Sequence, residues 1–276
     1  MKLSVAAGMG DTLLASDAYG ADTFMCQLDA LSYAKIDGVQ VRKRSISTKP
    51  DVVMPARGVI RIQGQEYLVG TDVDDYWKGS PIRTNYVIQG TDGLATLYSI
   101  AQALSNAAPT SAYASLVFSR YLPDEADSSK YPPQYQLFLA GSESVPTDSL
   151  LQLNGVWYLI KSSYHSTSGL LIGMANEIKG TVFETVSVSG RTYNPLTDTY
   201  SGAPAIIKIM RVKWQEHFNY LSKGQINYER GDEQVFILKA QMSPAPADTL
   251  TLSDGSWKIM DVQDEGLIWS CHVRRV

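Results

Sequence analysis

Cysteine and histidine are scarce in this chain of 276 residues, which contains two of the first and three of the second. Cys26 and Cys271 stand near opposite ends of the chain, so a disulfide framework is excluded and at most one bridge is possible. We expect two free thiols, which is usual for a protein kept in a reducing compartment. No Cys-x-x-Cys occurs, and no histidine has a partner at the spacing of metal ligands, so a zinc site is not predicted.

Catalytic signatures are missing as well. The chain has no Gly-x-Ser-x-Gly elbow, no Walker A loop and no Gly-x-Gly-x-x-Gly fingerprint. Asp72, Asp74 and Asp75 are spaced like the start of a calcium loop, but the glycine and the distant glutamate of such a loop are absent. We predict that the protein is not an enzyme and has no catalytic residue, cofactor or metal ion. No apolar run approaches 18 residues, so no membrane contact is expected.

Charged residues make up 19% of the chain, which is low, and the net charge is -4. A net negative charge argues against a protein whose main role is to bind nucleic acid. By contrast, 16 Tyr, 5 Trp and 21 Gly are generous numbers, and they favour β structure and buried interfaces.

Alternation of apolar and polar residues predicts strands through most of the chain, for example at 59–62, 136–139, 206–209 and 235–238. Asn154-Gly155 and Asp254-Gly255 are typical of two-residue hairpin turns. One clear helix is predicted at about 92–106, capped by Thr91 or Asp92, because its apolar residues recur every three or four positions. A weaker helical pattern occupies 214–221.

Three stretches share one pattern, in which a proline and a glycine stand nine residues apart and an aromatic residue follows. The stretches begin at Pro55, Pro146 and Pro246, and the aromatic residues are Tyr67, Trp157 and Trp257. Each stretch reads as a hairpin whose second strand buries the aromatic, and we expect Trp157 and Trp257 to be equivalent. A hairpin alone is marginally stable, so each one needs further strands.

These patterns predict a mainly β chain of two or three small tandem modules, each a barrel or sandwich. The expected modules are 1–90 with a basic strand face, 91–180 with the helix, and 181–276. Within the first, residues 41–90 form the only net-positive stretch, and Arg42 and Arg44 share one strand face there. That face is either solvated or a contact for an acidic protein or DNA phosphates, and we favour an acidic partner over DNA.

Two polar segments with aromatic residues are candidate interaction arms. The first is the loop predicted at 71–81, with Tyr76 and Trp77, and the second is 124–133, with Tyr131. Either both bind partners or both fold back on their own module.

The C-terminal pattern resembles a known family. Pro246–Met260, the stretch from Val262 to Gly266 and the last strand ending at Val276 look like the closing hairpin of head–tail joining proteins of tailed bacteriophages, also called head-closure or stopper proteins. The resemblance covers about the last 45 residues, and 146–160 matches it less well. It implies a small β-barrel in a homo-oligomeric ring of the virion neck, with no cofactor and no catalysis.

The resemblance leads to one expectation and leaves two alternatives. We expect a structural protein that joins the portal side of the head to the tail, as a hexameric or dodecameric ring in contact with other neck or tail proteins. Packaged DNA would touch this ring only in passing. It would be assembled in the cytoplasm of the bacterial host. A tail or baseplate protein is one alternative, and a carbohydrate-binding β module with exposed Trp and Tyr on a concave face is the other.

Overall fold

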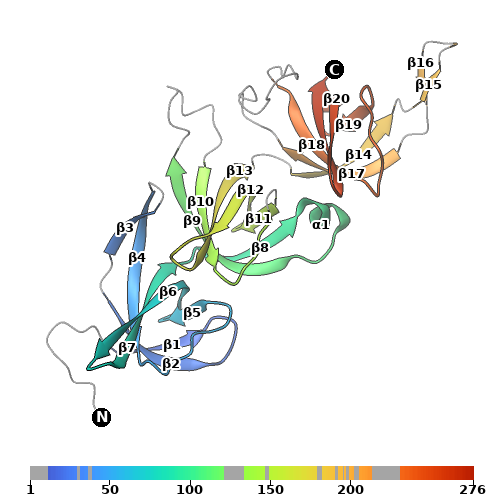
Figure 1. Cartoon of the computed structure of the whole chain (residues 1–276). Coiled ribbons are helices and arrows are strands. Elements are labelled where there is room, and N and C mark those ends of the chain that lie inside the picture. The colour runs from blue at the N-terminus through green and yellow to red at the C-terminus, as the bar shows by residue number, and fades with distance from the viewer. Residues whose placement is uncertain are drawn as a thin grey trace.

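Three β-barrels follow one another along the chain, and Figure 1 shows them in a row. The computed structural model describes residues 12–29, 32–36, 39–120, 134–146, 149–178, 182–189, 192–194, 196, 199–201, 205–212 and 231–276. In these residues the expected mainly β fold of small tandem modules is confirmed, with α1 (Ile100–Ser105) as the one described helix. The pattern at 214–221 lies outside them.

The first barrel closes where β2 pairs with both β1 and β4, and β3 extends it as a hairpin with β4. Its strands are β1 (Thr12–Asp17), β2 (Thr23–Leu28), β3 (Ser32–Ile36), β4 (Val39–Thr48), β5 (Val59–Ile62), β6 (Gln65–Trp77) and β7 (Ser80–Gly90).

The second and third barrels are closed rings of six antiparallel strands each. The second consists of β8 (Gly93–Ser99), β9 (Thr110–Arg120), β10 (Gln134–Ala140), β11 (Ser149–Leu153), β12 (Val156–His165) and β13 (Leu170–Ile178). The third consists of β14 (Phe183–Ser189), β17 (Ala205–Val212), β18 (Glu233–Leu238), β19 (Thr249–Leu252), β20 (Gly255–Glu265) and β21 (Ile268–Arg275), with a separate hairpin of β15 (Thr192–Asn194) and β16 (Thr199–Ser201).

All three barrels have the same strand order. If the six barrel strands of a module are counted along the chain, their order around the ring is 1-2-3-6-5-4 each time, with β3, β15 and β16 as additions. The modules are therefore repeats of one topology.

Two further landmarks recur at the same place in each barrel. The hairpin of the fourth and fifth strands turns through two residues, which are Gln63–Gly64, Asn154–Gly155 and Ser253–Asp254. Six positions after each turn the register of the fifth strand shifts at a β-bulge, at Gly70, Lys161 and Met260. These landmarks align the three modules residue by residue.

The alignment corrects the predicted equivalence of Trp157 and Trp257. The third residue after the turn points into the barrel in every module, and it is Tyr67, Tyr158 or Trp257. Trp157 comes one residue earlier and points outward, where it packs on Tyr98 and Phe183. The prediction aligned Gly155 with Gly255, but Gly155 is the second turn residue and Gly255 is the first residue of β20. A shift of one residue moves a strand side chain to the other face.

The predicted helix at 92–106 is also corrected. Leu94 to Tyr98 belong to β8, which pairs with β9 on one side and β11 on the other. Closure of the barrel thus overrides the helical spacing. The helix begins only after Ser99, whose hydroxyl accepts from the Gln102 amide in a capping box, and it ends at Asn106 in a left-handed conformation.

The first and second barrels are joined by an apolar core and by backbone contact. Val59 and Leu68 of the first pack with Phe138 and Ile172 of the second. At the bulge of β6, the Thr71 amide donates to the Ser168 carbonyl over 2.7 Å. A β-carbon on Gly70 would lie 2.5 Å from that carbonyl oxygen, so only glycine allows this approach.

The second and third barrels share a larger apolar core that contains one face of α1. Leu104 and Leu159 of the second barrel pack with Met210 and Phe236 of the third. The Lys208 ammonium donates to the Ala103 carbonyl over 2.8 Å and so binds the end of the helix. The three barrels therefore form one continuous body.

Trp257→Ala should destabilise the third barrel by about 3–5 kcal/mol, because Trp257 is a large core residue with 3% exposure. Urea unfolding followed by fluorescence measures the change. Tyr164→Ala, at a side chain that is 46% exposed, is the control and should stay within about 0.5 kcal/mol of the parent. Equal effects of the two changes would contradict the alignment above.

Gly70→Ala should loosen the first barrel from the second, since the new methyl group meets backbone oxygens of Ser168 and Val87. Scanning calorimetry should show the first barrel melting at a lower temperature than the rest. Gly90→Ala is the matched control, because its β-carbon meets only a ring carbon of Tyr67 at 3.9 Å. An unchanged calorimetric profile for Gly70→Ala would argue against the close junction.

Candidate interaction surfaces

The segment predicted as a loop at 71–81 is a β-hairpin, and we call residues 72–85 the arm. β6 and β7 continue past the bulge at Gly70 and turn at Lys78–Gly79, both with positive φ. The prediction missed the strands because Asp72, Asp74 and Asp75 lower the apparent β propensity. Tyr76 lies near the tip and is 62% exposed, and Trp77 ends β6 with a side chain outside the described residues.

Polar pairs across the two strands hold the arm in register. Arg83 and Asp75 stand opposite each other and form an ion pair, and the Thr84 hydroxyl donates to Asp74 over 2.6 Å. The hydrogen bond from Arg83 lowers the pKa of Asp75 below its usual value. Val73 and Ile82 are 66% and 52% exposed, so the arm presents apolar side chains to solvent on both faces. Such a two-stranded projection is stabilised when another molecule covers it.

A groove of about 540 Å³ lies at the opposite end of β6 and β7, where the first barrel meets the second. Its walls come from four strands, β4, β6, β7 and β9, and from the link between the barrels. They are Arg44 of β4, Gln65 and Tyr67 of β6, residues 88–92, and residues 115–118 of β9. Arg44 was predicted as an interface residue, and it is part of this wall.

Two buried polar groups in this groove have no hydrogen-bond partner among the described residues. The Gln89 side chain is 5% exposed, and its amide nitrogen donates to the Ser115 hydroxyl over 3.4 Å. Its Oε1 accepts no hydrogen bond from any residue that the structure describes. The Thr91 hydroxyl is likewise buried, with no partner in the described ranges. An unpaired buried acceptor costs about 1–3 kcal/mol, so a donor entering the groove is favoured.

Much of the basic stretch at 41–90 is neutralised within the chain. Arg57 stacks on the Tyr19 ring and pairs with Glu143 at 3.0 Å, which links the first two barrels. Arg61 pairs with Glu66 at 3.0 Å. Arg42 lies in β4 with a side chain outside the described residues, as does all of the 124–133 segment with Tyr131. Of the two predicted interface cations, Arg42 and Arg44, Arg44 is the one whose side chain the structure describes.

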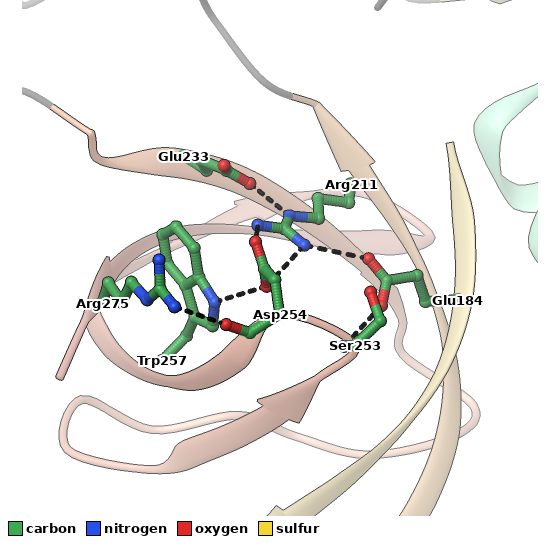
Figure 2. Close-up of polar contacts among 7 residues, drawn as sticks. All are labelled: Glu184, Arg211, Glu233, Ser253, Asp254, Trp257 and Arg275. Carbon is green, nitrogen blue, oxygen red and sulfur yellow. Dashed lines mark hydrogen bonds and ion pairs between the residues drawn. The ribbon is translucent and has the colours of Figure 1, made fainter. Parts of the chain in front are cut away.

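The third barrel contains a buried cluster of charges that sequence reasoning missed (Figure 2). Arg211, with 1% exposure, donates to Asp254 over 2.7 and 2.9 Å, to Glu184 over 3.1 Å, and to Glu233. The Trp257 indole also donates to Asp254, over 3.0 Å, and its ring lies beside the guanidinium. The cluster thus ties four strands and one hairpin turn together.

Charge compensation sets the pKa values in this cluster. Burial alone would lower the pKa of Arg211, but hydrogen bonds from it to Asp254, Glu233 and Glu184 raise its pKa well above the usual value. Burial would raise the pKa of Glu184, yet the Ser253 amide and Arg211 donate to it and lower its pKa below 4.5. The arrangement stabilises the barrel and leaves Arg211 occupied by its own carboxylates.

Of the two described histidines, His272 has a structural role and His165 is exposed to solvent. His272 is buried beside Asp232, whose carboxylate lies 2.7 Å from its Nε2 and also accepts from Arg274. His165 is exposed at the end of β12, and His217 lies outside the described residues. Cys26 and Cys271 are free thiols in the cores of the first and third barrels, and burial raises the pKa of Cys271 to about 12.

Within the described part of the chain, no group of three or more His, Cys, Asp or Glu is arranged to hold a metal ion. The same residues include no helix long and apolar enough to cross a membrane. Comparisons with known protein families, with curated proteins and with solved structures found no match to this chain.

Arg211→Met should destabilise the protein by about 3–5 kcal/mol at pH 7, because three carboxylates lose their common cation. In the parent, Glu184 contributes stability above pH 4.5 that is lost as the pH falls through its lowered folded pKa. In the variant, the carboxylates take up protons more readily. The free energy of unfolding in urea should therefore differ less between Arg211→Met and the parent at pH 4 than at pH 7.

Arg83→Met serves as the control, since its ion pair with Asp75 lies on the exposed arm. It should leave the unfolding midpoint unchanged. A difference between Arg211→Met and the parent that stays constant with pH would show that the cluster is not held by charge.

Proposed function

We propose that the protein is a structural subunit of the neck of a tailed bacteriophage, where a ring of copies joins the portal side of the head to the tail. The observation that supports this most is the union of three barrels of one topology into a single elongated body. A connector subunit must span a distance and resist bending, and buried apolar junctions between modules provide both.

The region of the family resemblance agrees with the proposal in its architecture. Residues 246–276 form β19, β20 and β21, which are consecutive strands of the third barrel. The head–tail joining proteins that this stretch resembles are small β-barrels themselves. The same architecture repeated three times would give a taller ring than one barrel does.

The arrangement of charged groups also fits a role without catalysis. Arg211 lies inside the third barrel among the carboxylates of Glu184, Glu233 and Asp254. His272 is buried and pairs with the Asp232 carboxylate of the same barrel. In this role the protein needs no cofactor. Its partners would be further copies of itself in a hexamer or dodecamer, and the neighbouring neck or tail proteins.

A tail or baseplate position would use the same body with different neighbours, and it stays an alternative. A carbohydrate-binding module ranks below both. That function favours exposed tryptophans on one concave face, whereas Trp157, Trp257 and Trp269 are each at least partly buried in apolar clusters.

The proposal is tested on virions of the phage that encodes the chain. Mass spectrometry should find the protein in purified particles, and electron cryo-microscopy should place its three barrels in a ring between portal and tail. Analytical ultracentrifugation of the isolated protein gives the ring number. Absence from purified virions, or binding of glycans by a stable monomer, would contradict the proposal.

A further inference from the structure

We propose that copies of this chain associate head to tail, with the arm of one copy, residues 72–85, seated in the Arg44 groove of the next. The inference rests on the proposed homo-oligomeric function and specifies the contact that would build the oligomer. It is carried by the placement of the two surfaces, by the unpaired groups in the groove, and by the groups that the arm offers.

The two surfaces lie at opposite ends of the same two strands. β6 begins at Gln65 in the groove wall and ends at Trp77, and β7 returns from Ser80 at the tip to Gly90 in the groove wall. Thirteen residues at about 3.3 Å each separate them by about 40 Å. The arm therefore cannot reach the groove of its own chain, and any contact between them joins two copies. A contact between two different patches is heterologous, and it closes into a ring when the rotation allows.

The groove lacks what the tip of the arm supplies. Gln89 Oε1 and the Thr91 hydroxyl are buried and have no partner in the described part of the chain, and the Tyr76 hydroxyl is an exposed donor. Among the residues that the structure describes, that hydroxyl has only a long 3.4 Å contact with Asp74. The tyrosine ring also matches the groove walls, which include Tyr67 and Val117. A tyrosine that fills a pocket and pairs its hydroxyl is a frequent anchor of protein interfaces.

Charge complements shape at this contact. Arg44 stands in the groove wall, and Asp72 is exposed on the arm. The same charges disfavour DNA as the occupant of the groove. Asp92 also lines the groove, and buried acceptor oxygens beside it would repel phosphate. The arm is the better match, because it brings the Tyr76 hydroxyl as a donor together with Asp72 for Arg44, whereas a phosphate brings acceptors alone.

The experiment measures self-association by sedimentation velocity over a range of concentrations. Tyr76→Ala on the arm and Arg44→Glu in the groove should each weaken association of the parent at least tenfold. Tyr76→Phe should weaken it less, because it removes only the hydroxyl. Tyr164→Ala, an exposed aromatic of the second barrel, should associate like the parent. Circular dichroism verifies that each variant is folded.

Two combinations make the test specific. A mixture of Tyr76→Ala and Arg44→Glu chains retains one intact arm and one intact groove per pair, so it should form dimers that grow no further. The charge swap Arg44→Glu with Asp72→Arg should recover association that Arg44→Glu alone loses. Parent-like association of both single variants, a mixture that stays monomeric, or a parent that is monomeric throughout would overturn the contact.

These outcomes are separable from the neck assignment. A ring in virions that forms from Tyr76→Ala chains would leave the proposed function standing and reject this contact. Arm-dependent association of a protein that is absent from virions would reject the function and keep the contact.

Discussion

The outer apolar faces of the barrels are the constraint on which the rest of the structure depends. Strand side chains alternate between the inside and the outside of a barrel, and a solvated barrel places polar residues outside. Here Phe138, Leu159 and Met210 point outward and are fully buried nonetheless. Such faces need a cover, and the adjoining barrel provides it. One chain of three small domains is thereby fixed as a single body, and the arm and the groove acquire fixed positions on it.

The fold class and the repeat could be predicted because strand alternation and hairpin turns are local properties. The spacing from proline to glycine located the same hairpin in all three modules. What the spacing could not give was the register, which depends on whether glycine is the second turn residue or the first strand residue. Trp157 and Trp257 were therefore placed as equivalents, although Tyr158 is the residue that corresponds to Trp257.

The predicted helix at 92–106 shows that a local pattern can indicate the wrong secondary structure. Leu94, Leu97 and Tyr98 satisfy helical spacing, but their backbone completes the second barrel between β9 and β11. Hydrogen bonds to strands distant in sequence decided the outcome. Ser99 and Gln102, which cap the real helix, were readable as a capping box.

The surfaces were predicted only in part, because their residues come together from separate strands. Tyr76 and Arg44 were singled out from the sequence, but nothing in their spacing indicated an arm and a groove about 40 Å apart. The Arg211 cluster draws its carboxylates from three other places in the chain, at Glu184, Glu233 and Asp254. One signal was present, since Arg211 interrupts the apolar run of β17, and a cation in a buried strand requires partners.

The central claim is that three barrels act as one stiff body whose ends differ. Small-angle X-ray scattering, recorded at concentrations where the chain is monomeric, tests this claim most directly. The account predicts a curve that a single elongated arrangement of the three barrels fits across the whole angular range. A curve that requires an ensemble of bent shapes, with the barrels moving independently, would contradict it.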